Sequence, residues 1–437
     1  MSEVPLELQA AIYELWNKSH QSEQRAFTSK EFKHLCEVCY RQSQRPIVRK
    51  KSLTSLDRSA FGIALQHFFI NVGAPWFKNC AAPSSAETAE LLWKALMSER
   101  HSVSYLIPLD LADELPQLGF GPWRLGTYTV EELASLMKTS RFVTRERVDI
   151  ENLKRLSRFD WLLLRTEEDL PAPEVQAFPF LSRDLADIGK VIPHPEQFPA
   201  VVEQGLFVFI LYPWETLSEA NFVPWQPFRF PWLYRVPESP FYSQPAPPNA
   251  DRLSWEPYFF PDGTEDEIPS VMSIDTENLV NLETKLERYW NLTNNVLPAS
   301  GQGHSAISKS IRHFMLRAFR DDGFDQLLWH MVALEATLGQ QEHGSTVKIA
   351  RRAAALCAEE GLYDDVRTYY DWRSDFIHGR KVREPDIWEG NLREVRKAVR
   401  SIVVRFMELC QDNRNWDRAM ALQYLNELAD QRQLPKK

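Results

Sequence analysis

Apolar positions in the first hundred residues recur at helical spacing. In the two clearest runs, 55–72 and 86–100, apolar side chains return every three or four positions and strand-forming residues are few. After residue 100 the pattern changes to short β-branched and aromatic runs bounded by Pro, Gly and acidic turns. These runs are 101–111, 120–130, 159–166 and 205–214. The pattern predicts a helical region over 1–100, followed by a β-rich or mixed module over 101–262.

Helical spacing returns in the last part of the chain, and we expect an all-α helical domain over 263–437. The runs with this spacing are 279–292, 324–339, 347–357, 362–378 and 391–410. Strand-like runs between two helical regions indicate the α+β class, with a C-terminal helical bundle preceded by a β-rich module and an N-terminal helical region.

Proline and aromatic residues are concentrated in one segment of the β-rich module. Residues 213–261 hold 11 of the 28 Pro of the chain together with four Trp. Proline at this density disfavours helix interiors and central strands, and the aromatic content is too high for a bare linker. We expect a packed, extended arm, which either covers a core irregularly or recognises a partner. The acidic stretch 262–267 is expected to mark the boundary before the helical domain.

Composition is that of a globular protein, with 437 residues, 44% of them apolar, and a formal net charge of −9. Residues 301–437 hold 22 Lys and Arg against 20 Asp and Glu, which leaves the first 300 residues near −11. This acidic balance argues against a general nucleic-acid coat protein. A local basic face is expected on the helix at 391–410, either solvated or in contact with phosphates. It consists of Arg393, Arg396, Lys397 and Arg400.

Motifs for metals, disulfides and membranes are few. Cys36 and Cys39 form one CxxC pair without a second pair at zinc-finger spacing, so we expect core cysteines and no metal or cofactor. The chain has no apolar run of about 18 residues and no basic segment followed by an apolar one at its start, so we expect a cytoplasmic protein with no membrane contact.

One arginine stands on the apolar stripe of the helix predicted at 362–378. With Val366 at the centre of a helical wheel, Leu362, Tyr369, Tyr370 and Ile377 fall within about 60° of it, and so does Arg373. A guanidinium on a buried face is costly unless a carboxylate pairs with it. Glu335 lies near the middle of the apolar stripe of the helix at 324–339 and is the predicted partner. The pair is either a structural ion pair or part of an active site.

A histidine follows this arginine by five residues. His378 precedes Gly379, a residue that suits the end of a helix, so the imidazole is expected at the negative end of the helix dipole. Imidazole titrates near neutral pH and can both accept and donate a proton. A lone histidine is more often a satisfied surface or core residue, and the neighbouring Arg373 is what favours a site here.

The run from about 305 to 410 resembles the HEPN superfamily, and within it the Apea-like branch. The resemblance is carried by ALEATLG at 333–339, the basic helix at 347–357, and YYDWRSDFIHGR at 369–380, which contains an Arg-x4-His motif. It implies a dimerising helical bundle and, in many members, a metal-independent endoribonuclease of toxin or antiviral defence systems. It further implies that Arg373 stabilises charge on the scissile phosphate, that His378 moves a proton, and that Glu335 is an accessory acidic residue.

Substrate contacts are expected around this motif. We place Arg380 and Lys381 after it as phosphate contacts, and Ser374 and Asp375 inside it as further polar contacts. With an Arg, a His and no evident metal cluster, the most accessible nucleophile is the 2′-hydroxyl of the substrate, which RNA has and DNA lacks. Two copies of the motif across a two-fold axis would supply both an acid and a base, so we expect a homodimer.

Two functions therefore follow from the sequence. The first is a defence or toxin-type endoribonuclease that acts on RNA and is regulated by its N-terminal region, through which a trigger or regulatory protein would bind. The alternative is a non-catalytic HEPN module that acts by dimerisation and by binding a ligand or protein. Under the alternative, Arg373 is structural and His378 is dispensable.

Overall fold

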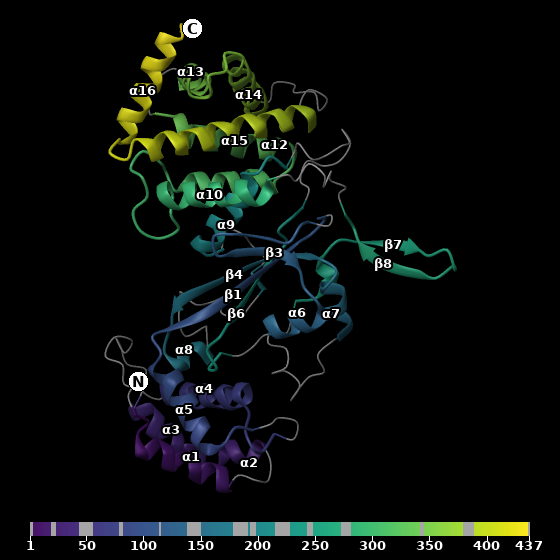
Figure 1. Ribbon diagram of the computed structural model, residues 1–437, viewed down its shortest axis with the longest axis vertical. Coiled ribbons are helices and arrows are strands. Elements are labelled where there is room, and N and C mark those ends of the chain that lie inside the picture. The colour runs from purple at the N-terminus through teal and green to yellow at the C-terminus, as the bar shows by residue number, and fades with distance from the viewer. Residues whose placement is uncertain are drawn as a thin grey trace. The chain divides into compact units, whose positions relative to one another are not determined.

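The computed structural model of the chain is shown in Figure 1. It describes residues 3–18, 23–42, 56–77, 82–112, 115–137, 150–177, 191–192, 198–214, 228–242, 248–271, 281–340, 345–378 and 389–435. The predicted α+β class is confirmed: the chain has N-terminal helices, a central antiparallel sheet and a C-terminal helical region. Within the described residues, no helix combines the length and apolar character needed to cross a membrane.

Two compact units make up the chain, and each is assembled from three segments. The first unit consists of Met1–Pro108, Thr127–Pro193 and Trp232–Arg252. The second consists of Leu109–Gly126, His194–Pro231 and Leu253–Lys437. The division at about residues 100 and 262 that the sequence suggests stays a prediction.

In the part of the first unit that the structure describes, five helices come first, and two of them correspond to the runs of helical spacing at 55–72 and 86–100. They are α1 (Leu6–Lys18), α2 (Glu23–Thr28), α3 (Lys30–Gln42), α4 (Leu56–Val72) and α5 (Ser85–Met97). Their shared core is rich in aromatic rings; the Trp76 ring lies 5.4 Å from that of Trp16 and 5.5 Å from that of Phe69. A reciprocal capping box between Ser84 and Glu87 starts α5, because each side chain satisfies the other's free backbone N–H.

Four strands of the first unit follow the order β4-β1-β6-β5. Their bounds are β1 (Arg100–Leu109), β4 (Asp160–Asp169), β5 (Val191–Ile192) and β6 (Leu233–Pro237). The proline-rich segment was expected to hold no central strand, and β6 shows this to be wrong. β6 is an interior strand that pairs antiparallel with β1 from Leu106↔Tyr234 to Val103↔Pro237. The strand is possible because its single proline, which has no N–H to donate, stands at the last position.

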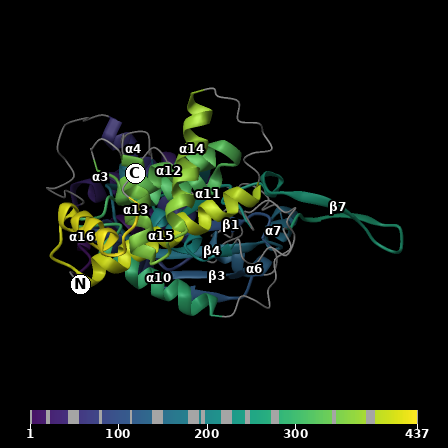
Figure 2. The same cartoon turned by 90° about the horizontal axis from the view of Figure 1, so that it is seen from above.

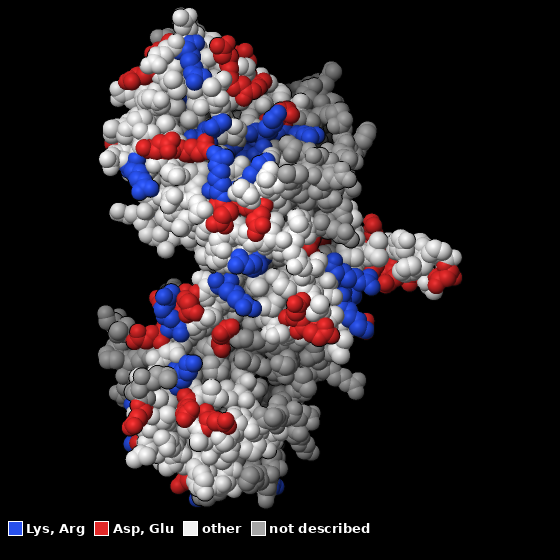
Figure 3. Space-filling model, in the orientation of Figure 1, with Lys and Arg blue, Asp and Glu red and all other residues white. Residues whose placement is uncertain are grey.

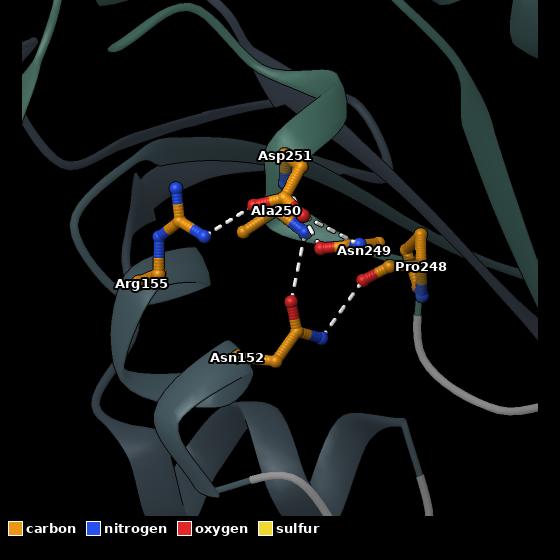
Figure 4. A network of polar contacts seen from close by, with 6 residues as sticks. All are labelled: Asn152, Arg155, Pro248, Asn249, Ala250 and Asp251. Carbon is orange, nitrogen blue, oxygen red and sulfur yellow. Dashed lines mark hydrogen bonds and ion pairs between the residues drawn. The ribbon is translucent and has the colours of Figure 1, made fainter. Parts of the chain in front are cut away.

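Short helices complete the first unit: α6 (Val130–Leu136), α7 (Ile150–Leu156), α8 (Pro173–Ala177) and the 3-10 turn η6 (Ala250–Arg252). Figure 4 shows how α7 holds η6. The Asn152 amide donates to the carbonyl of Pro248 at 3.0 Å and accepts the N–H of Ala250 at 2.8 Å, and Arg155 pairs with Asp251. The Arg155 partner holds the pKa of Asp251 below its usual value. These polar contacts tie two segments together that lie about a hundred residues apart.

A hairpin and a buried helix open the second unit. The hairpin consists of β2 (Leu118–Phe120) and β3 (Trp123–Thr127), and the helix is α9 (Ala200–Ile210). The run 205–214 was expected to be a strand, and its first part is instead helical. Every residue from Gln204 to Ile210 is buried, so no polar face marks the helix period, and a short apolar run of this kind reads equally well as a strand.

Two glycines let the hairpin approach the helices of the same unit. A Cβ added at Gly205 of α9 would overlap the indole of Trp123, and one added at Gly121 would overlap that of Trp290. Gly121 also has φ +50°, a conformation that favours glycine, and its N–H donates to the carboxylate of Glu287 at 2.7 Å.

A second hairpin, β7 (Trp255–Phe259) with β8 (Glu265–Pro269), belongs to the same unit. Figures 1 and 2 show it extending away from the helices of the unit. The acidic stretch 262–267 was expected to be a domain boundary; it forms the turn and the start of β8. Asp262 accepts the N–H of Thr264 at 2.9 Å, which fixes the turn that joins the two strands.

Among the described residues, seven helices complete the second unit, and the five predicted C-terminal runs correspond to five of them. The seven are α10 (Leu282–Val296), α11 (Ser310–Arg320), α12 (Gly323–Leu338), α13 (Ser345–Cys357), α14 (Leu362–Ile377), α15 (Glu389–Asp412) and α16 (Arg418–Gln431). α12 packs against α11, α13, α14 and α15, so it is the central helix of the bundle, and α10 lies beside α15 (Figure 1). The core of the bundle includes Leu327, Met331, Val399 and Phe406, which are fully buried.

Candidate functional site

α12 and α14 bring together the arginine and the glutamate that the sequence paired. Nη1 of Arg373 lies 2.6 Å from Oε1 of Glu335. The contact joins two apolar helix faces, as predicted, because each charge interrupts an apolar stripe. The pair is half-buried: 28% of the Arg373 side chain and 41% of the Glu335 side chain are exposed. A ligand from solvent can therefore reach it.

Tyr370 forms the buried side of this pair. Its ring lies beneath the guanidinium of Arg373, 6.0 Å from ring centroid to the central carbon, and its side chain is 7% exposed. Burial raises the pKa of Tyr370 well above its usual value, and the negative charge of Glu335 raises it further. The phenol therefore stays neutral, and it offers Arg373 a polarisable surface that does not neutralise its charge.

His378 stands at the C-terminal end of α14. Its backbone N–H donates to the carbonyl of Ser374 at 3.0 Å, and its side chain is exposed. Five helical residues advance about 7.5 Å along the axis, so His378 lies roughly that far beyond Arg373 in the direction of the helix. The structure therefore joins Arg373 to Glu335, and places His378 in solvent at the end of the same helix.

The last turn of α14 departs from the predicted apolar stripe. Leu362, Val366, Tyr369 and Tyr370 are buried as expected, but Ile377 is 55% exposed. The buried part of the stripe therefore ends before Ile377. Phe376, also largely exposed, still stacks on Phe324 of α12 with ring centroids 3.3 Å apart.

The expected substrate contacts divide into two groups. Ser374 and Asp375 lie half-buried on the last turn of α14, next to Arg373. Arg380 and Lys381 lie outside the described residues.

Two arginines that the sequence did not single out hold the end of α12. Arg418 of α16 donates to the carbonyl of Gly339 at 2.8 Å and to that of Glu335 at 3.4 Å. Arg352 of α13 donates to the carbonyl of Leu338 at 2.8 Å, and burial lowers its pKa to about 10. These donors satisfy carbonyls that a helix end leaves open, and they fix the turn that carries the Glu335 carboxylate. No local sequence motif predicts this role, because each arginine lies on a different helix from the one whose end it caps.

The basic face expected on α15 is only partly present. Lys397 is exposed and Arg393 and Arg400 are half-buried, but Arg396 is 3% exposed and belongs to the core. Arg396 precedes Val399 by three residues and Val403 by seven, a spacing that puts it on the apolar stripe. Figure 3 shows Lys and Arg side chains gathered over the region of α15, with Asp and Glu among them. The surface is thus mixed in charge rather than a continuous basic stripe.

Cysteines and potential metal ligands were also located. Cys36 and Cys39 lie on α3, and Cys39 is part of the core of the N-terminal helices. Burial raises the pKa of Cys36 to about 12 and that of Cys39 well above its usual value. Within the part of the chain that the structure describes, no three His, Cys, Asp or Glu side chains gather as metal ligands do.

Comparison with known proteins returned no match, whether against protein-family models, curated proteins or solved structures.

Proposed function

We propose that the chain is a metal-independent endoribonuclease of the HEPN type, a defence or toxin effector that acts in the cytoplasm. The observation that carries the proposal is the pairing of Arg373 with Glu335 on a half-exposed surface, with His378 exposed at the end of the same helix. An arginine held in place but open to solvent suits a phosphate, and an exposed imidazole nearby suits proton transfer.

In this reaction the 2′-oxygen of a ribose attacks the adjacent phosphorus. A new P–O bond forms, the bond to the 5′-oxygen breaks, and a cyclic phosphate and a free 5′-hydroxyl result. Arg373 stabilises the charge on the phosphate oxygens, and His378 takes the proton of the 2′-hydroxyl or supplies one to the leaving 5′-oxygen. The Glu335 carboxylate accepts a hydrogen bond from Nη1 of Arg373 and so orients the guanidinium. A guanidinium has five N–H donors in all.

A homodimer would complete the site, because one His378 in each subunit provides an acid and a base for the same phosphate. The exposed apolar side chains of Phe376 and Ile377 at this helix end support an interface there. Under this proposal the N-terminal region would receive a trigger or regulatory protein that controls cleavage.

The alternative is a non-catalytic HEPN module. It is favoured by the close contact between Arg373 and Glu335, since a guanidinium paired with a carboxylate binds a phosphate less readily. In that case the pair serves to hold α12 against α14, and the helix end binds a protein or ligand.

Cleavage of a single-stranded RNA by the purified full-length chain in EDTA separates the two functions. We expect wild-type protein to cut this RNA and to leave uncut a copy with 2′-deoxyribose at the cleaved position. Arg373→Ala and His378→Ala should each slow cleavage about a hundredfold or more. Arg367→Ala, a change of a half-buried arginine on the same helix, is the matched control and should leave the rate unchanged.

Full activity in both Arg373→Ala and His378→Ala would refute the site. Absence of cleavage by wild-type protein, with His378→Ala indistinguishable in stability and Arg373→Ala less stable, would support the non-catalytic module.

A further inference from the structure

The hairpin of β7 and β8 forms a two-stranded sheet of its own in the second unit. Its base is fixed, because the N–H and the hydroxyl of Ser254 donate to the carboxylate of Asp110 at 2.8 and 2.9 Å. The N–H of Ser270 donates to the carbonyl of Ser254 at 3.0 Å and closes the first pair of the ladder. Every residue from Glu256 to Glu267 is exposed. The outer part of the hairpin therefore projects into solvent from an anchored base (Figures 1 and 2).

Three consecutive aromatic residues lie exposed on this projection: Tyr258 at 43%, Phe259 at 66% and Phe260 at 40%. The rings of Tyr258 and Phe260 pack edge to face with centroids 4.9 Å apart, and Phe259 points to the opposite face, because side chains alternate along a strand. The turn beyond them is tight: the N–H of Phe260 donates to the carbonyl of Thr264 at 2.8 Å, and Gly263 has φ +85°. Both faces of the hairpin thus offer apolar rings in a fixed arrangement, which is typical of a binding surface.

The two edges of the hairpin are poor templates for a further strand. Hydrogen-bonded and non-hydrogen-bonded pairs alternate along an antiparallel ladder, and the hydrogen bonds at the base and at the turn fix which pairs are which. Pro257 of β7 and Pro269 of β8 fall at positions whose backbone faces outward, and proline has no N–H to offer there. The outward N–H of Glu267 is taken by the carboxylate of Asp266 at 2.9 Å. A partner must therefore bind the side chains on the faces of the hairpin rather than extend its sheet.

Charge on the hairpin has one sign. Residues 255–269 contain five acidic residues and no Lys, Arg or His, which gives a formal charge of −5. Glu265 stands directly across the ladder from Phe259, and Asp266 from Tyr258, so acidic groups flank the rings on both faces. Figure 3 shows acidic side chains at the outer end of the projection. Such a surface repels RNA phosphates, anionic lipid head groups and a second acidic hairpin, and it attracts Lys and Arg.

We propose that the β7–β8 hairpin is a docking arm for a different protein, whose surface presents an apolar pocket rimmed by Lys and Arg. Phe259, the most exposed ring, enters the pocket, and the carboxylates beside it pair with the basic rim. A second copy of the chain suits this role less well. On α15, for example, the exposed Lys397 and Arg405 already pair with glutamates of the same helix. The docking arm is separate from the Arg373 pair and does not depend on the proposed RNA cleavage.

Photo-crosslinking in the native cells tests the docking arm. The full-length chain carries the photo-reactive residue p-benzoylphenylalanine in place of Phe259, and a control chain carries it in place of Tyr13, an aromatic residue that is 61% exposed on α1. Mass spectrometry identifies what is captured. We expect a protein that is captured from position 259 and not from position 13. Capture of RNA, of lipid or of a second copy of the chain, or equal capture from both positions, would overturn the proposal.

Calorimetric titration of the captured protein, once purified, with the full-length chain decides whether the contact is specific. Phe259→Ala should weaken binding at least tenfold, because it removes the anchoring ring. Glu265→Lys should weaken it at least tenfold as well, and the wild-type affinity should fall with added salt, because the rim contacts are ionic. Tyr13→Ala is the matched control and should bind as wild type does. Equal affinity for Phe259→Ala and Tyr13→Ala, or an affinity that Glu265→Lys leaves unchanged, would contradict the docking arm.

Discussion

Arg373 and Glu335 lie 38 residues apart in the chain and join α14 to α12 through an ion pair of 2.6 Å. Each charge alone would be a defect on its helix, since each stands on a mainly apolar face. Together they form a half-exposed pair at a helix–helix interface. This arrangement contributes to both stability and the proposed chemistry, and the two roles respond differently to substitution.

A double-mutant cycle on this pair should show weak coupling. Glu335→Gln, Arg373→Gln and the double variant are expected to give an interaction energy of about 0.5–1 kcal/mol in urea denaturation, because solvent screens a half-exposed pair. A coupling energy well above about 2 kcal/mol would mean that the pair is effectively sealed, and would favour a structural role.

Arg418→Met should destabilise the protein by about 1–3 kcal/mol. The substitution keeps most of the side-chain volume but removes the donors that satisfy the carbonyls of Glu335 and Gly339 at the end of α12. Arg414→Met, at an exposed position just before α16, is the matched control and should stay within about 0.5 kcal/mol of wild type. Denaturant midpoints of the two variants provide the comparison, and equal midpoints would contradict the capping role of Arg418.

Gly205→Ala should destabilise the second unit by about 1–3 kcal/mol. Its Cβ would overlap the indole of Trp123, and neither the buried helix nor the hairpin can yield without losing packing. Gly361→Ala, where a Cβ meets open space and φ is −57°, is expected to be neutral or slightly stabilising. Thermal unfolding followed by tryptophan fluorescence distinguishes the two. A neutral Gly205→Ala would show that the contact with Trp123 is looser than described.

Stability should fall as the pH drops below about 6.5, in part because of His330. Burial and the nearby Arg396 and Arg400 lower its pKa in the folded protein, whereas in the unfolded chain the imidazole titrates near 6.5. Between these two pKa values the unfolded state binds a proton that the folded state does not. The free energy of unfolding therefore decreases by up to about 1.4 kcal/mol for each pH unit of acidification.

The contribution of His330 can be isolated by comparison with His330→Asn. Urea denaturation at a series of pH values should show a shallower loss of stability below pH 6.5 for the variant, because the titrating group is gone. Parallel curves for wild type and variant would rule out a neutral buried His330.

Several helices with one polar face were predictable from the sequence. The helices α5, α13 and α15 were expected within a few residues of their bounds, because their apolar positions repeat every three or four residues. α9 was not, because its second half is buried on all sides and no polar face shows its period. β6 was not either, because proline content describes a segment as a whole and not the position of each proline in it.

The sequence by itself determined the helical regions at both ends, the strand-like runs between them, and the one pair of opposite charges that needed each other across a helix interface. An unpaired charge is costly to bury, so Arg373 was predicted to pair with a carboxylate across the helix interface. Glu335 is that carboxylate. Only the tertiary structure decided how far that pair opens to solvent. It also decided that Arg418 holds the end of α12, and that His330 lies buried in the core. These features depend on the distance between side chains far apart in the chain, and local periodicity carries no information about that distance.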